Sequence, residues 1–213
     1  MKILVFGGFL GAGKTTVIMQ MVRHMVSVDQ NVKSKVVLLE NEIGNAGIDD
    51  KAMAGIGLRV ETLFSGCVCC TMAGEMIENI KYIDKKFSPE WIVLETTGMA
   101  YPSKIKENIR ENFPELECRL MCLVDARRWN RLQKVPELRQ FSAEQLYGAD
   151  VVLINKCDLV SEEELEAVDA SVREINDKPL LVHIVAKNEV CEDTWRKILE
   201  EKTFPAGHQE AMQ

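Results

Sequence analysis

A glycine-rich segment near the start of this 213-residue chain limits its possible folds more than any other feature. Its residues are Gly8-Phe9-Leu10-Gly11-Ala12-Gly13-Lys14-Thr15, and they match the pattern G-x-x-x-x-G-K-[ST] in full. Glycines in such a loop let backbone N–H groups curl around phosphate oxygens, and a helix that follows adds its positive dipole end. The segment therefore predicts a phosphate-binding loop between a buried strand at residues 2–6 and a helix at residues 14–28.

The residue types in this loop suggest separate tasks. Lys14 is expected to neutralise the β- and γ-phosphates and is a candidate catalytic residue. The Thr15 hydroxyl is placed to ligate Mg²⁺, and Thr16 can reach the α-phosphate. The predicted phosphate-binding residues are Gly11, Ala12, Gly13, Lys14, Thr15 and Thr16.

The rest of the chain alternates short apolar runs with amphipathic stretches. Strands are expected at residues 2–6, 35–39, 58–63, 91–94, 120–124, 151–154 and 180–185. Helices are expected at residues 14–28, 72–86, 102–112, 136–147, 162–175 and 193–201. The apolar runs lack polar alternation, as strands buried on both faces do. This order predicts an α/β fold of the P-loop NTPase type: an open, mostly parallel sheet with helices on both faces, in a single domain.

Charge and hydropathy narrow the possible partners. The chain has 33 acidic and 26 basic residues and a formal net charge of −7, which argues against binding to nucleic acid or to anionic lipid. No apolar run approaches the ~20 residues of a membrane span, and no signal peptide is recognisable. We therefore expect a cytoplasmic protein with one domain over residues 1–205 and a frayed tail over residues 206–213.

A second motif predicts the base. Asn155-Lys156-Cys157-Asp158 follows a buried strand, and nucleotide bases bind at the carboxyl ends of such strands. Asp158 can accept hydrogen bonds from N1–H and the exocyclic amine of guanine, whereas adenine would leave its carboxylate unpaired. Asn155 can face the N7/O6 side and the Lys156 stem can lie across the base. The alternative for Asp158 is a helix N-cap.

Two further segments are expected to reach the nucleotide. At Ala186-Lys187, the Ala186 N–H can donate to guanine O6. At Glu95-Thr96-Thr97-Gly98, a strand delivers a carboxylate that can hold a Mg²⁺-bound water, and the Gly98 N–H can sense the γ-phosphate. The alternative for Glu95 is a helix-capping acid.

Catalysis itself has few candidates. Glu95 and Lys14 are expected to act in hydrolysis, and Asp49 is a candidate for orienting water or Mg²⁺. No arginine is assigned to the transition state, so the intrinsic rate is expected to be slow. The basic residues Arg127, Arg128, Arg131 and Lys134 are expected to form a solvated helix face.

Three of the seven cysteines crowd into Cys67-Val68-Cys69-Cys70. Thiolates at this spacing can converge on one soft or borderline ion such as Zn²⁺, Co²⁺ or Cu⁺, and Glu42 or Glu61 can complete the set. Two alternatives remain at this point: buried cysteines packed as small hydrophobic residues, and a redox switch.

The motifs together resemble a known family. Gly7 to Thr16, Asn41-Glu42-Ile43-Gly44, Gly66 to Cys70, Glu95 to Gly98 and Asn155 to Asp158 stand in the order seen in CobW-type GTPases, relatives of the nickel chaperones HypB and UreG. The resemblance covers nearly all of the chain. It implies a GTPase that binds GTP or GDP with Mg²⁺ and carries Zn²⁺ or Co²⁺ to a target protein, often as a GTP-dependent homodimer. It also implies that Cys67, Cys69 and Cys70 are metal ligands, with Glu42 as a nearby switch-region acid.

Two departures from the family pattern affect the expected function. The second, C-terminal domain of many CobW-type proteins does not fit in this length, so target recognition is expected to use this domain or a separate protein. Histidine-rich metal-storage stretches are also missing, since the only histidines are His24, His183 and His208. Two other functions remain open: a GTPase chaperone that gates or reactivates a cobalamin or corrinoid enzyme, and a metal buffer or sensor.

Overall fold

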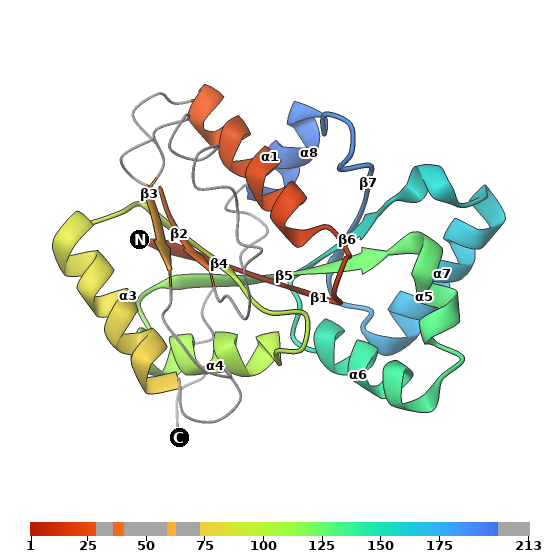
Figure 1. Ribbon diagram of the computed structural model, residues 1–213, viewed down its shortest axis with the longest axis horizontal. Helices are drawn as coiled ribbons and strands as arrows, with labels where there is room; N and C mark the ends of the chain where they lie inside the picture. The colour runs from red at the N-terminus through yellow and green to blue at the C-terminus, as the bar shows by residue number, and fades with distance from the viewer. Residues whose placement is uncertain (29–35, 41–58, 63–72, 200–213) are drawn as a thin grey trace, which may run out of the picture.

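The computed structural model describes residues 1–28, 36–40, 59–62 and 73–199. Its strands form one parallel sheet in the order β3-β2-β4-β1-β5-β6-β7. The strands are β1 (Lys2–Gly8), β2 (Val36–Glu40), β3 (Arg59–Thr62), β4 (Trp91–Glu95), β5 (Glu117–Asp125), β6 (Val151–Asn155) and β7 (Leu180–Ile184). This arrangement confirms the predicted open parallel α/β sheet (Figure 1).

Helices cover both faces of the sheet. One face packs against α1 (Lys14–Val28) and α8 (Glu192–Leu199). The other face packs against α3 (Ala73–Phe87), α4 (Pro102–Asn112), α5 (Ala126–Leu132), α6 (Pro136–Leu146) and α7 (Glu162–Ile175). Figure 1 shows α1 and α8 on one side of the strands and α3, α4 and α6 on the other.

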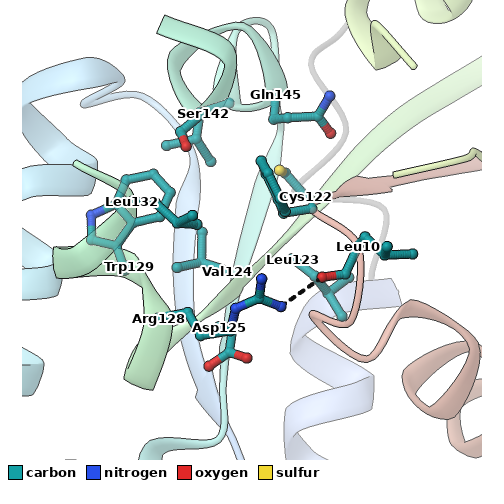
Figure 2. A pocket seen from close by; sticks show the side chains of 12 residues that line it. Leu10, Cys122, Leu123, Val124, Asp125, Arg128, Trp129, Leu132, Ser142 and Gln145 are labelled. Carbon is teal, nitrogen blue, oxygen red and sulfur yellow. Dashed lines mark hydrogen bonds between the residues drawn. The ribbon is translucent and has the colours of Figure 1, made fainter. Parts of the chain in front are cut away.

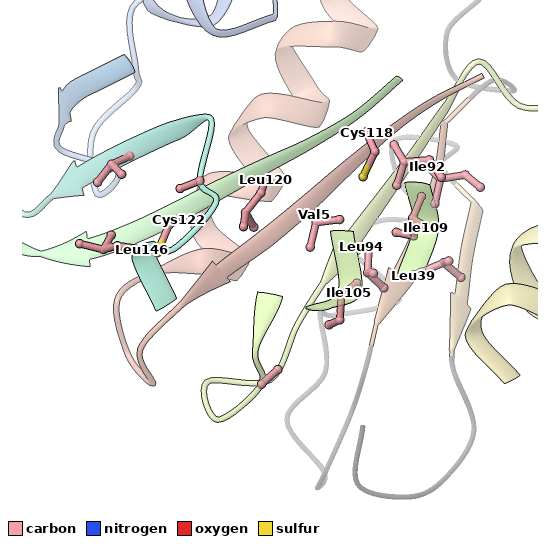
Figure 3. Close-up of a cluster of buried hydrophobic side chains, with 14 of the residues drawn as sticks. Val5, Leu39, Ile92, Leu94, Ile105, Ile109, Cys118, Leu120, Cys122 and Leu146 are labelled. Atoms are coloured by element: carbon pink, nitrogen blue, oxygen red, sulfur yellow. The ribbon is translucent and has the colours of Figure 1, made fainter. Parts of the chain in front are cut away.

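The two cores explain why the strand sequences are apolar throughout. In β1, Ile3 and Val5 point into the core under α3 and α4, whereas Leu4 and Phe6 point into the core under α1. All four side chains are fully buried. Figure 3 shows the first core, where Val5 lies among side chains from neighbouring strands and α4. A strand buried on both faces needs no polar alternation.

Helix boundaries follow local signals closely. The predicted helices at residues 14–28, 102–112 and 162–175 have the observed bounds of α1, α4 and α7. Helix α4 begins with Pro102, and α7 begins after Ser161, whose side chain and that of Glu164 form a capping box. Such end signals lie within a few residues of the boundary they set, so the sequence alone suffices to place them.

The fifth strand is longer than its apolar run. The predicted strand at residues 120–124 was too short, because β5 extends from Glu117 to Asp125. Its charged Arg119 is fully buried, and the guanidinium donates to the Ile198 carbonyl of α8. Helix α5 was also absent from the expected elements. The tail expected at residues 206–213 lies outside the described residues.

The register brings the carboxyl ends of the strands to one edge. Phe6 of β1 lies level with Glu95 of β4, and Asp125 of β5 lies level with Asn155 of β6. The glycine-rich loop leaves β1 at this same edge. None of the helices described here is long and apolar enough to cross a membrane.

Candidate functional site

Lys14 is buried at the start of α1, beneath the glycine-rich loop. Its ammonium donates to the Gly8 carbonyl at 3.0 Å, and the residue is 7% exposed. Burial lowers the pKa of the Lys14 ammonium, and the nearby Glu95 carboxylate opposes this shift. A phosphate anion in the loop would favour the charged form further, so the position suits the role predicted for Lys14.

The Thr15 hydroxyl and the Glu95 carboxylate meet although they are 80 residues apart. The hydroxyl donates to Oε1 at 2.9 Å and to Oε2 at 3.1 Å. Burial raises the pKa of Glu95, and the hydrogen bond from Thr15 together with the charge of Lys14 opposes the shift. Both side chains are oxygen donors, which Mg²⁺ prefers, so they fit the predicted Mg²⁺ site. A bound Mg²⁺ would supply positive charge to the phosphates there, with Thr15 as a ligand and Glu95 holding one of its waters.

The loop after β4 touches the glycine-rich loop. The Thr96 N–H and hydroxyl both bond to the Phe6 carbonyl, at 3.0 and 2.9 Å. A Cβ atom added to Gly98 would lie 2.7 Å from the Leu10 backbone nitrogen, so this position admits no larger residue without movement. The Gly98 N–H is thereby held beside the loop predicted to bind the phosphates.

Asn155 joins three segments rather than standing free. Its side-chain amide donates to the Ala12 carbonyl at 2.9 Å, and its Oδ1 accepts from the backbone N–H groups of Lys156 and Ala186. The residue is 3% exposed. A Cβ atom on Gly13 would come within 2.5 Å of the Asn155 amide nitrogen. The Ala186 N–H, predicted to donate to guanine O6, donates to Asn155 at 2.9 Å in this structure.

Lys156 links the base motif to the glycine-rich loop. Its backbone is left-handed, with φ of 65°, and its ammonium donates to the Gly11 carbonyl at 2.7 Å. The same ammonium forms an ion pair of 2.6 Å with Asp125 at the end of β5. This ion pair and the hydrogen bond to Gly11 together hold Lys156 against the loop.

The remaining predicted nucleotide contacts face solvent. Thr16, Asp158 and Lys187 are exposed. Asp158 lies in a short 3-10 turn (Cys157–Leu159), and the N-cap of α7 is Ser161. The alternative in which Asp158 caps a helix is therefore wrong.

The predicted transition-metal ligands lie outside the described residues. Glu42, Cys67, Cys69 and Cys70 all fall in that part of the chain, as does Asp49, the candidate for orienting water or Mg²⁺. Within the ranges that the structure describes, no cluster of three or more potential metal ligands occurs. Burial raises the pKa of the Cys118 and Cys122 thiols to about 12, so both stay protonated at neutral pH and behave as core side chains.

Two residues near the loop carried no clear sequence signal. Arg128 of α5 donates to the Leu10 carbonyl at 2.9 Å (Figure 2). Its guanidinium lies 5.9 Å from the centre of the Phe9 ring. This side chain contacts the loop instead of belonging to a fully solvated face. Gln145 of α6 accepts a hydrogen bond of 2.9 Å from the Gly8 N–H. Neither contact could be found from local spacing, since 118 and 137 residues separate the partners.

Two curated proteins are similar to this chain in sequence. The chain is 30% identical over 217 residues to the zinc chaperone CobW of a Sinorhizobium species, an alignment that covers 86% of this chain and 58% of the relative. It is 27% identical to the zinc chaperone YeiR of Escherichia coli K12, with 83% and 52% covered. The chain thus spans somewhat more than half the length of these two curated relatives.

Solved structures support the fold. HypB from Archaeoglobus fulgidus superimposes with a TM-score of 0.68 at 18% identity, covering 95% of this chain and 90% of that one. The Zn(II)-bound YjiA GTPase of Escherichia coli gives 0.61 at 22% identity, with 90% and 59% covered. The profile described as the nucleotide-binding domain of CobW/HypB/UreG matches residues 2–183. On this evidence the chain belongs to the CobW/HypB/UreG family of P-loop GTPases.

Proposed function

We propose that this protein is a GTP-hydrolysing metallochaperone, which binds Zn²⁺ or Co²⁺ and delivers it to a target protein. The observation that carries the proposal is the meeting of Lys14, Thr15 and Glu95 at the carboxyl edge of the sheet. Asn155 and Lys156 bond to the same loop from the other side. Family membership supports the link between such a site and metal delivery.

The nucleotide half of the proposal follows from the side chains at that edge. Backbone N–H groups of residues 11–13 and the Lys14 ammonium bind the phosphates, and Thr15 with Glu95 holds Mg²⁺. Asp158 selects guanine over adenine, with Asn155 and Lys156 shaping the base site. Positioning and charge stabilisation supply most of the catalysis in phosphoryl transfer. We assign the catalytic role to Lys14 and Glu95, and to Asp49 the orientation of the attacking water.

The proposal of a transition-metal site is supported by the positions at which β2 and β3 end. In the parallel register, Glu40 at the end of β2 lies level with Glu95, and Thr62 at the end of β3 lies level with Glu40. Glu42 follows β2 by two residues in the sequence, and Cys67 follows β3 by five. The proposed metal ligands, Cys67, Cys69, Cys70 and Glu42, therefore follow strands that end beside the proposed Mg²⁺ site.

This placement suggests linkage between nucleotide and cargo metal. While GTP is bound, segments that respond to the γ-phosphate hold the thiolates in an arrangement that binds the metal ion. Hydrolysis of GTP loosens this arrangement and releases the metal ion. A GTP-dependent homodimer is part of the same proposal, by analogy with the family. Zinc is favoured as cargo because the relatives CobW and YeiR are zinc chaperones, and cobalt fits the same thiolate ligands.

Metal competition experiments test this function. Zn²⁺ and Co²⁺ affinities are measured against a chromophoric chelator, with Mg²⁺ and either a non-hydrolysable GTP analogue or GDP. The expected result is tenfold tighter metal binding or more in the GTP state, about 1.4 kcal/mol of coupling. A Cys67/Cys69/Cys70→Ala variant should abolish both the binding and the difference.

Other outcomes separate the alternatives. Tight metal binding that ignores the nucleotide would indicate a buffer or sensor. Metal binding no stronger than in the triple variant would overturn the metal assignment. Hydrolysis that responds to a cobalamin-dependent enzyme but not to free metal would then support a GTPase that gates that enzyme.

A further inference from the structure

Gln145 is a buried polar side chain that the proposed chemistry does not use. It lies at the end of α6 and is 3% exposed. Its Oε1 accepts from the Gly8 N–H at 2.9 Å, and its Nε2 donates to the Ala100 carbonyl. The partners fix the orientation of the amide, because a backbone N–H can only donate and a carbonyl can only accept.

The two partners of this amide belong to the two loops that should respond to GTP. Gly8 is the last residue of β1 and opens the glycine-rich loop. Ala100 closes the turn that begins at Thr97, since its N–H donates to the Thr97 carbonyl at 3.1 Å. That turn contains Gly98, the proposed sensor of the γ-phosphate. One side-chain amide therefore joins the phosphate loop to the sensing loop.

Gly8 also connects this amide to the proposed catalytic lysine. Its N–H is held by Gln145, and its carbonyl accepts from the Lys14 ammonium at 3.0 Å. A displacement of the Ala100 loop would thus pull on Gln145, and Gln145 on the residue that positions Lys14. The hydrogen bonds lie in a buried region, where a lost partner leaves an unsatisfied polar group.

Gln145 also borders a small cavity behind the phosphate loop. The cavity has a volume of about 20 Å³ and is lined by Gln145, Ser142, Leu10 and side chains of β5 and α5. Figure 2 shows Gln145 and Ser142 on the α6 side of this cavity and Leu10 on the opposite side. Phe141 of α6 also packs against Phe9 of the loop, with ring centroids 5.6 Å apart, so Gln145 supplies the hydrogen-bonded part of the contact between the loop and the helix.

We propose that Gln145 is a positioning residue that couples the phosphate loop to the loop at residues 96–101, and thereby sets the preference for GTP over GDP. The inference rests on the proposed GTPase function. A side chain that only anchored α6 to the sheet would affect folding stability and leave this preference unchanged.

The test compares nucleotide preference in variants of the full chain. Affinities for fluorescent GDP and for a fluorescent non-hydrolysable GTP analogue are measured with Mg²⁺, at a temperature where each variant is folded. Gln145→Met removes both hydrogen bonds at similar length. Gln140→Met on the same helix is the control, because Gln140 is exposed and far weaker bonded, to Glu144 at 3.4 Å.

The expected result is a loss of preference. In Gln145→Met, the ratio of GTP-analogue affinity to GDP affinity should fall about fivefold or more, the scale of one hydrogen bond. Gln140→Met should keep the native ratio. If Gln145→Met lowers the melting temperature but keeps the ratio within twofold, the amide is only a structural anchor and the inference is wrong.

A second variant guards against loss of folding and adds a distinctive readout. Gln145→Glu keeps an acceptor for the Gly8 N–H, but its ionised form cannot donate to the Ala100 carbonyl. Its protonated form can, so the affinity ratio relative to native protein should recover as the pH falls from 8 to 6. A ratio in Gln145→Glu that matches native protein at both pH values would also overturn the inference. If the native chain binds neither nucleotide, the proposed function fails and the inference fails with it.

Discussion

Two buried lysines in different parts of the molecule differ in the groups that their ammonium ions contact. Lys14 and Lys106 are almost equally buried, at 7% and 6% exposure. Lys106, on α4, has an ion pair of 2.7 Å with Asp150 before β6 and a further bond to the Gly148 carbonyl at 2.8 Å. Lys14 instead donates to a neutral partner, the Gly8 carbonyl.

The different partners of the two lysines suit different roles, since Lys106 contributes to folding stability and Lys14 is placed to bind an anion. The carboxylate of Asp150 neutralises Lys106 within the fold, and it also accepts from the Leu120 N–H at 2.7 Å. A buried ion pair with extra hydrogen bonds of this kind becomes costly when one partner is removed. For Lys14, burial disfavours the charged form more than the nearby Glu95 carboxylate favours it, and an incoming phosphate would offset that cost.

The largest expected effect is on folding stability, at the fully paired site. Lys106→Met should destabilise the protein by about 3–5 kcal/mol, because Asp150 would remain buried without its counter-ion. Urea unfolding measures this loss, and Lys104→Met on an exposed position of α4 is the control. Nucleotide affinity at a temperature where the variant is folded should stay within about threefold of native. If Lys106→Met lowers the free energy of unfolding by less than about 1 kcal/mol, the ion pair with Asp150 does not stabilise the fold as described.

Substitution of Lys14 should change nucleotide affinity far more than folding stability. Lys14→Met should weaken binding of both GTP and GDP about 100-fold or more, about 2.7 kcal/mol, since the ammonium is the buried charge nearest the proposed phosphates. Equilibrium titration with fluorescent nucleotides measures it. Unchanged affinity in this variant would remove Lys14 from the binding site.

A smaller effect is expected at the acid beside Lys14. Glu95→Gln should reduce the gain in GTP-analogue affinity on adding Mg²⁺ about tenfold, while affinity in the presence of a chelator changes little. Glu117→Gln is the control, because Glu117 is exposed at the start of β5, away from the carboxyl ends of the strands, and pairs with Lys2 at 3.5 Å. An equal loss with and without Mg²⁺ would argue against a metal role for Glu95.

The smallest effect concerns pH. Because burial lowers the pKa of Lys14 in the folded protein, the unfolded chain binds more protons at this residue in the range below the ordinary value of 10.5. Stability of the nucleotide-free native protein should therefore rise with pH through that range on account of this group. Lys14→Met should melt about 2 °C higher than native at pH 7, and the gap should narrow towards pH 10. A gap that widened with pH would contradict the assigned cause.

Sequence patterns predicted the fold well because its signals are local. Proline at the start of α4 and the Ser161–Glu164 capping box fix helix ends within a few residues. The run at residues 120–124 failed to show the full length of β5, because the burial of Arg119 depends on a carbonyl 79 residues later. A local sequence pattern cannot predict a partner so distant in the chain.

The candidate site divides in the same way. Motif spacing identified Lys14, Thr15 and Glu95, and the structure places them together. Gln145 and Arg128 were missed as contacts of the loop, since a glutamine or arginine on an amphipathic helix has no distinctive spacing. Predicting a hydrogen bond between residues more than 100 positions apart requires the order of the strands in the sheet. The alternation of strands and helices along the sequence does not specify that order.

The bonds of Asn155 have a consequence for the order in which the site forms during synthesis. The phosphate loop leaves the ribosome early, but the amide that holds the Ala12 carbonyl is 143 residues further along the chain. At roughly 5–20 residues per second, that interval lasts about 7–29 seconds. Throughout it the nascent loop lacks its hydrogen bond from Asn155, so we expect tight nucleotide binding only after synthesis has passed β6.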